Sequence, residues 1–163
     1  MKKGMMVGIL LLAIAGIVHA AGIDIANHPS CNYCGMNRTK FAHSRMLVEY
    51  DDGSAVGVCS LRCAAVELVN SLDKSPLRIG VGDYADQKLI DAEKAVWVVG
   101  GNKPGVMTAN AKWAFATKEK AEVFIKENGG VVASFETAIQ SAYQDIYQDT
   151  RAIRERRKAR RAQ

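Results

Sequence analysis

The sequence predicts an α+β protein made of two strand-strand-helix-strand units that pack together, followed by a C-terminal amphipathic helix. The first observation is that runs of strand composition and a helical apolar pattern occur twice in the same order, at about 31–84 and 93–134. The second is a continuous apolar helical face that starts at Phe135. Because neither small unit can bury its own sheet face, the two are expected to pack together or share a sheet.

The first unit is predicted to contain a β-hairpin, a helix and a return strand. A turn sequence, Asp-Asp-Gly-Ser at 51–54, separates two runs of strand composition. Ser60 can cap the helix, which ends before Pro76. Ahead of this unit, residues 21–30 are expected to be an extended lead-in, because Pro29 disfavours helix at the residue before it. The strands are expected at 45–50, 55–58 and 77–81.

The second unit is predicted to repeat this order without obvious sequence identity. Residues 95–99 and 112–116 have strand composition and flank a glycine-rich loop. Thr117 can cap the helix that follows, and the Gly-Gly pair at 129–130 suits a left-handed C-terminal cap. A short third strand is expected at 131–133.

The first 20 residues predict a cleaved export signal. Lys2 and Lys3 precede an apolar run, and Val18-His19-Ala20 is a small-x-small sequence that signal peptidase could cut. The run is shorter than the roughly 20 residues that a membrane helix needs, although an uncleaved anchor is the alternative. No cysteine lies near the cleavage point, so a lipoprotein is not expected. The mature protein is therefore expected in the periplasm.

Positive charge is concentrated in the C-terminal tail at 151–163. The chain carries +5, of which two charges belong to the export segment and six to the tail, so the domain at 21–150 carries −3. The basic pI therefore does not indicate a nucleic-acid-binding domain. The tail is expected to be a frayed, solvated extension. The alternative is a weak attraction to a membrane surface with anionic lipid or to an acidic partner.

The most chemically specific feature is a set of cysteines with the spacing C-x2-C-x24-C-x3-C. Cys31 and Cys34 lie on a short turn, while Cys59 and Cys63 lie where a strand enters a helix. A helix N-terminus lowers thiol pKa values and so favours thiolate. Met36 adds a thioether in a polar turn where a methionine has no core to fill. Such soft ligands suit Cu(I) better than hard cations, although the pattern alone does not name the metal.

The cysteines also allow three other interpretations. Two structural disulfides would fit an oxidising compartment, although such closely spaced pairs close loops too small to stabilise much. Four thiolates could hold a structural zinc ion in a binding or interaction module. A thiol-disulfide oxidoreductase is less favoured, because Cys31 and Cys34 do not start a helix after a strand. The sequence has no Ser/His/Asp constellation, HExxH or phosphate loop, so an enzyme is not expected.

Several motifs of the mature chain occur together in one known family. They are Cys31-Asn32-Tyr33-Cys34-Gly35-Met36, Cys59-Ser60, Gly82-Asp83-Tyr84, Trp97-Val98-Val99-Gly100-Gly101, Met107 and the ending from Phe124 to Gly130. With the hairpin they resemble the NosL family, exported accessory proteins of nitrous oxide reductase that bind Cu(I). The resemblance covers residues 31–141, and its Cys-x-x-Cys-Gly-Met core is the specific part.

The resemblance implies a fold of two strand-strand-helix-strand units and a Cu(I) site that uses a cysteine of the first pair with Met107. It also implies a copper chaperone whose partners are a copper-receiving enzyme, by resemblance nitrous oxide reductase, and its maturation machinery. Cys63 adds a fourth thiol that resembles small four-cysteine modules and could close the site around zinc instead. The candidate metal ligands are Cys31, Cys34, Met36, Cys59, Cys63 and Met107.

Overall fold

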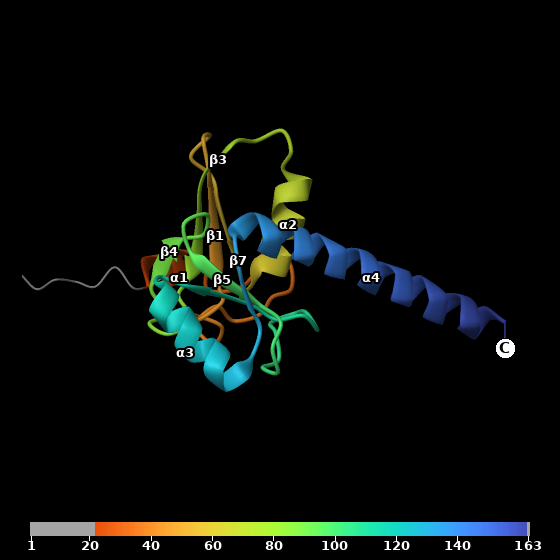
Figure 1. The fold of residues 1–163 in the computed structure, drawn as a ribbon. Helices are drawn as coiled ribbons and strands as arrows, with labels where there is room; N and C mark the ends of the chain where they lie inside the picture. The colour runs from red at the N-terminus through yellow and green to blue at the C-terminus, as the bar shows by residue number, and fades with distance from the viewer. Residues whose placement is uncertain (1–21, 163) are drawn as a thin grey trace, which may run out of the picture.

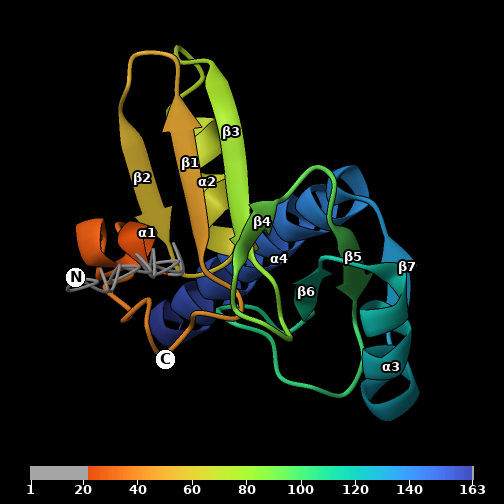
Figure 2. The same ribbon diagram turned by 90° about the vertical axis from the view of Figure 1, so that its left-hand side faces the viewer.

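The protein contains two antiparallel sheets, each packed against a helix (Figures 1 and 2). The structure is a computed structural model that describes residues 22–162. The first sheet has the strand order β2-β1-β3-β4 and packs against α2. It contains the predicted hairpin, helix and return strand, and it adds β4, which the sequence did not indicate. The bounds are Met46–Tyr50 for β1, Ala55–Val58 for β2, Leu61–Asn70 for α2, Pro76–Gly82 for β3 and Leu89–Asp91 for β4.

The second sheet repeats this topology with the strand order β6-β5-β7. In both units the first strand is central, with its hairpin partner on one side and the strand after the helix on the other. Thr117 caps α3 by accepting a hydrogen bond from the backbone N–H of Lys120, and Gly129 ends the helix with a φ of 71°. The bounds are Val96–Val99 for β5, Lys112–Phe115 for β6, Lys118–Asn128 for α3 and Val131–Ala133 for β7.

The segment after β3 joins the two units. The carboxylate of the fully buried Asp83 accepts a 2.6 Å hydrogen bond from the backbone N–H of Ala116. The backbone N–H of Tyr84 donates to the carbonyl of Ala114 at 2.8 Å. These bonds cross from one unit to the other, and a single hydrophobic core contains buried residues of both units. The aromatic rings that pack on Tyr84 there include Trp113, Phe115 and Phe124.

The long helix α4, Phe135–Arg161, packs across both units and then extends away from them (Figure 1). Ser134 caps it, and its first two turns bury an apolar face against α2 and β5. The tail was expected to be frayed and solvated: its residues are exposed as expected, but it is not frayed, because the helix continues to Arg161. Arginine, lysine, alanine and glutamate are good helix formers, and no glycine or proline interrupts them.

The expected extended lead-in at 21–30 is also wrong, because Ile23–Asn27 form the short helix α1. This helical turn carries the carboxylate of Asp24 inward to Arg38 and Arg45. The restriction imposed by Pro29 applies only to His28, which is indeed not helical. Two buried ion pairs thus hold this short helix against the rest of the fold.

The predicted export segment at 1–20 lies outside the described residues. Within residues 22–162, no helix has both the length and the apolar character needed to cross a membrane. The longest of them, α4, ends in a strongly basic stretch.

Candidate metal site

The fold brings the four cysteines together from three different elements. Cys31 and Cys34 lie in the loop after α1, Cys59 directly follows β2, and Cys63 lies in the first turn of α2. All four Sγ atoms lie within 4.8 Å of one another, and all four thiols are free. The predicted convergence of the two pairs is therefore present, and the structure contains no disulfide between them. We call these four residues the cysteine cluster.

The sulfur separations match those around one metal ion. A tetrahedral ion with sulfur ligands at about 2.3 Å places neighbouring sulfurs about 3.8 Å apart. The Sγ atoms of Cys34 and Cys59 are 3.4 Å apart, those of Cys59 and Cys63 3.8 Å, and those of Cys34 and Cys63 4.0 Å. A single ion can therefore contact several of these sulfurs with little rearrangement of the backbone.

The two predicted methionines differ in their relation to the cysteine cluster. The Sδ atom of Met36 lies 4.0 Å from the Sγ atom of Cys59, so Met36 belongs to the same group of sulfurs. Met107 lies in the loop between β5 and β6, with 43% of its surface exposed. Among the described residues, the sulfur–sulfur contacts within 4.0 Å do not include Met107. Its role as a ligand stays a prediction.

The backbone of Met107 is unusual. Its φ is +60°, a left-handed conformation that residues other than glycine rarely adopt. The next residue, Thr108, donates its hydroxyl to the carboxylate of Asp145 on α4 at 2.5 Å, and Lys112 contacts the same carboxylate at 2.6 Å. The loop is thus fastened to α4 beside a methionine whose side chain is half exposed.

Burial gives the cysteine cluster a closed side and an open side. Cys31, Cys59 and Cys63 are buried, whereas Cys34 and Met36 are only partly buried. A bound ion would therefore be reached from the side of Cys34 and Met36. This arrangement differs from a fully enclosed structural site, in which every ligand is shielded.

A family model described as NosL matches residues 22–143. The chain belongs to the NosL family. Among solved structures it is similar to one titled crystal structure of the copper chaperone NosL from Shewanella denitrificans, with 25% sequence identity and a TM-score of 0.57. That match covers 69% of this chain and 90% of that chain.

No curated protein matches the chain significantly. The resemblance inferred from the Cys-x-x-Cys-Gly-Met core is nevertheless confirmed by the NosL model. The solved NosL structure is named as a chaperone, which agrees with the expectation that this chain is not an enzyme.

In this NosL-family chain, the loop that carries the first cysteine pair is closed by its own backbone. The N–H of Gly35 donates to the carbonyl of Cys31 at 3.0 Å, and the N–H of Cys31 donates to the carbonyl of Met36 at 2.8 Å. Gly35 has a φ of 72°, which glycine adopts without strain. The sequence Cys34-Gly35-Met36 therefore has a direct structural reason in this chain, because the glycine lets the chain turn between two sulfur residues.

Contacts among the thiols shift their pKa values in opposite directions. Contacts from Cys59 and Cys63 lower the pKa of Cys31, so the first thiolate of the cluster forms there. Contact with Cys31 raises the pKa of both Cys59 and Cys63, because one buried thiolate opposes the formation of another. A bound cation removes this opposition, since it stabilises several thiolates at once.

A buried charge network that the sequence did not reveal lies behind the cysteine cluster. Arg38, with no exposed surface, contacts the carboxylate of Asp24 at 2.9 Å, and Arg45 contacts it at 2.8 Å. Arg38 also donates to the carbonyl of Val58, the residue before Cys59, at 3.1 Å. Burial alone would raise the pKa of Asp24, but the two guanidinium groups outweigh it and the pKa is lowered. The network fixes the strand end from which the second cysteine pair starts.

A buried carboxylate, Glu67, is the second feature that the sequence did not reveal. Its side chain accepts hydrogen bonds from the hydroxyls of Tyr33 and Tyr50 at 2.7 Å each and from Ser71 at 2.9 Å. Burial opposes its ionisation, but these donors keep its pKa below the usual value. A usable signal was present, because Glu67 lies four residues after Cys63 and so shares its helix face.

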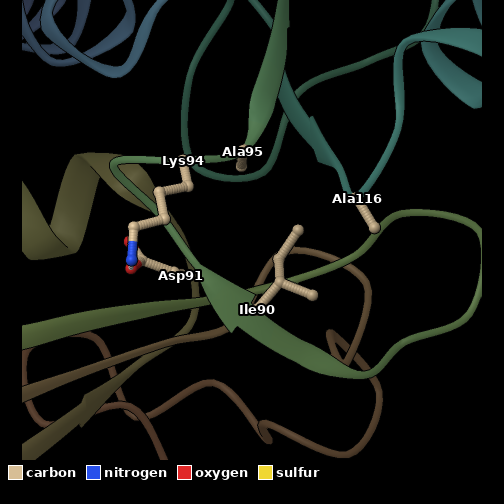
Figure 3. A pocket seen from close by; sticks show the side chains of 5 residues that line it. All are labelled: Ile90, Asp91, Lys94, Ala95 and Ala116. Carbon is tan, nitrogen blue, oxygen red and sulfur yellow. Dashed lines mark ion pairs between the residues drawn. The ribbon is translucent and has the colours of Figure 1, made fainter.

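A shallow pocket elsewhere in the molecule does not compete with the cysteine cluster as a metal site (Figure 3). Its two charged residues, Asp91 and Lys94, pair with each other at 3.1 Å. No cysteine, methionine or histidine lines it. The pocket is lined by Ile90, Asp91, Lys94, Ala95 and Ala116.

Proposed function

We propose that the mature protein is an exported Cu(I) carrier that binds the ion at the cysteine cluster and passes it to a copper-receiving enzyme. The observation that carries this proposal is the convergence of four free thiols within 4.8 Å, with a thioether 4.0 Å from one of them. Thiolate and thioether sulfur are soft ligands that favour Cu(I). Membership of the NosL family and the likeness to a solved copper chaperone support the same conclusion.

Transfer of the ion follows from the uneven burial of the ligands. The buried thiols of Cys31, Cys59 and Cys63 retain the ion, while the partly buried Cys34 and Met36 face the open side. A soft donor from the recipient can then replace one ligand at a time without unfolding the domain. We assign to Met107 the role of a further sulfur ligand that its loop supplies, because the residue is half exposed and held in a left-handed backbone conformation.

The recipient that we propose is nitrous oxide reductase, on the basis of the resemblance to its accessory proteins. Transfer would take place in the periplasm, since the first 20 residues have the composition of an export signal. The basic part of α4 would add a weak contact with an anionic membrane surface. Anaerobic mixing of the Cu(I)-loaded protein with the purified copper-free enzyme tests the recipient, and copper that stays on the carrier would argue against it.

Metal titration tests the proposal directly. The reduced mature protein should take about one Cu(I) from a chromophoric chelator, as expected for a single soft site. The double variant Cys34→Ser with Met107→Ala should bind it far more weakly. Asn102→Ala, a change at an exposed residue of the same loop as Met107, is the matched control and should behave as the wild type. Equal affinities in all three proteins would refute the ligand assignment.

A structural zinc site is the second candidate, because four thiols at tetrahedral spacing form a complete zinc ligand set. A structural zinc site couples metal binding to folding, so a chelator should unfold the domain. A carrier should stay folded, since the network of Arg38, Asp24 and Arg45 and the shared core do not depend on the ion. Far-UV circular dichroism with and without chelator distinguishes the two.

A further inference from the structure

The buried carboxylate of Glu67 links the two halves of the cysteine cluster. Glu67 lies on α2, one helical turn after Cys63. Tyr33 lies in the loop between Cys31 and Cys34, and its hydroxyl donates to the Oε2 atom of Glu67 at 2.7 Å. One hydrogen bond thus joins the element that carries the first cysteine pair to the helix that carries Cys63.

The two oxygens of the Glu67 carboxylate have different partners: one is bound by residues outside the cysteine loop, and the other is bound by the loop. The Oε1 atom of Glu67 accepts hydrogen bonds from Tyr50 on β1 and from Ser71 just after α2. The Oε2 atom accepts from Tyr33. The acceptor is therefore fixed in direction before the loop binds to it, as is required of a group that positions another.

The loop has few other attachments to α2. Its own backbone hydrogen bonds close it, and the backbone N–H of Asn32 fastens it to β2 by donating to the carbonyl of Gly57 at 3.0 Å, so its attachment to α2 is made by side chains. Apart from thiol contacts, the side-chain hydrogen bonds between residues 30–37 and α2 in the described structure are the one from Tyr33 to Glu67 and one at 3.4 Å from Asn70 to Tyr33. Both involve Tyr33, a residue that is 37% exposed and so adds little to the core.

We propose that the hydrogen bond from Tyr33 to Glu67 sets the distance between the two cysteine pairs and thereby tunes metal affinity. Tyr33 and Glu67 are positioning residues, because they act on the ion through Cys31, Cys34 and Cys63 rather than by contact with it. This inference rests on the proposed function of the cysteine cluster. The geometry itself, a loop fastened to a helix, does not depend on which metal is bound.

Two tyrosines provide a matched pair of variants. Tyr33→Phe and Tyr50→Phe each remove one hydroxyl that donates to Glu67 at 2.7 Å, but only Tyr33 lies in the cysteine loop. In chelator competition, Tyr33→Phe should weaken Cu(I) binding about tenfold, the effect of losing one hydrogen bond to a charged group. Tyr50→Phe should stay within about twofold of the wild type, because Ser71 still donates to the same Oε1 atom of Glu67. Its midpoint of thermal unfolding should fall further, because Tyr50 is fully buried.

Alkylation of the metal-free, reduced protein tests the positioning separately from copper. Cys31 is buried, so iodoacetamide should modify it slowly while the loop is fastened. Tyr33→Phe should raise this rate about tenfold, in proportion to the population of the open loop, and Tyr50→Phe should leave it unchanged. Mass spectrometry of the digested protein reports the modification of Cys31 itself.

The two measurements have separable outcomes. Equal Cys31 alkylation rates in the wild type and Tyr33→Phe overturn the positioning role, because the loop is then held by its other contacts. Equal effects of both tyrosine variants on Cu(I) affinity overturn it as well. A wild-type protein that binds no Cu(I) refutes the proposed function, while the alkylation rates still decide whether Tyr33 fastens the loop.

Discussion

The two strand-strand-helix-strand units have the same topology, but they use the start of their helices in different ways. In the first unit, Cys59 directly precedes the N-cap Ser60, and Cys63 lies three residues after it. In the second unit, Ala116 and Lys120 occupy the matching positions around Thr117. One helix start therefore carries two thiols, and the other carries a methyl group and an ammonium group.

The partners of these positions differ accordingly. The backbone N–H of Ala116 and the ammonium group of Lys120 both face the carboxylate of Asp83, at 2.6 Å and 3.7 Å. In the first unit, the thiols of Cys59 and Cys63 face each other and the loop thiol of Cys34. The same backbone topology thus carries the cysteine cluster at the helix start of the first unit. At the helix start of the second unit it carries an ion pair that joins the two units. The difference lies in a few side chains and not in topology.

The largest expected effect on Cu(I) affinity comes from removing both thiols at the helix start of the first unit, so that it lacks sulfur ligands like the helix start of the second. Replacing Cys59 and Cys63 together by alanine should weaken Cu(I) binding by more than about 100-fold, because the loss of even one direct ligand should cost at least the 10–100-fold of a second-shell change. The two losses need not multiply, since the thiols are 3.8 Å apart. Lys120→Ala, at the position that matches Cys63, should leave the affinity unchanged. Chelator competition under reducing conditions measures both. An affinity of the double variant within tenfold of the wild type would remove this pair from the ligand set.

The charged residues near the two helix starts also differ in burial, so their removal should differ in its effect on stability. Arg38 is fully buried, so Arg38→Met should lower the free energy of unfolding by about 3–5 kcal/mol, since Asp24 and several carbonyls lose a donor. Lys120 contacts Asp86 at a partly exposed position, and Lys120→Met should cost less than about 1 kcal/mol. Guanidinium denaturation measures the two losses. Similar losses would mean that burial does not distinguish the two networks.

The buried network of Asp24, Arg38 and Arg45 predicts how the free energy of unfolding depends on pH. The pKa of Asp24 is lowered in the folded protein by the two arginines, so its ion pairs contribute fully above the ordinary value of 3.8. This contribution is lost as the pH falls through the folded-state pKa, which lies below 3.8. The difference in urea midpoint between the wild type and Asp24→Asn should therefore shrink between pH 5 and pH 2. A difference that stays constant over this range would contradict the assignment.

The sequence predicted the fold wherever signals were local. Turn residues at 51–54 and 129–130 and the helix cap at Thr117 separate the elements, and period-specific apolar patterns define them. Ser60 occupies the N-cap position of α2 as predicted, but its side chain makes no capping hydrogen bond. The convergence of the cysteines was also predictable, because the first pair lies on a short turn and the second pair lies where a strand enters a helix. The helix α1 was missed, since five residues are too few to give a helical period.

The missed parts of the site depend on contacts that are distant in sequence. Asp24 pairs with Arg38 and Arg45, 14 and 21 residues away, and nothing near Asp24 indicates those partners. Glu67 meets Tyr33 across 34 residues. A buried carboxylate on an apolar helix face is a signal that some partner exists, but only the packed fold identifies it.

The smallest expected effect concerns the basic end of α4, which lies outside both units. Deleting residues 151–163 should leave Cu(I) affinity unchanged and shift the free energy of unfolding by less than about 0.5 kcal/mol, because residues 151–162 are exposed. The ion pair of Arg62 with Asp149 is retained in the truncated protein. Binding to vesicles with anionic phospholipid at low salt should be lost, since each basic residue contributes about 1 kcal/mol near such a surface. Neutral vesicles are the control, and full-length protein that ignores anionic vesicles while binding an acidic protein would instead assign this helix to a protein partner.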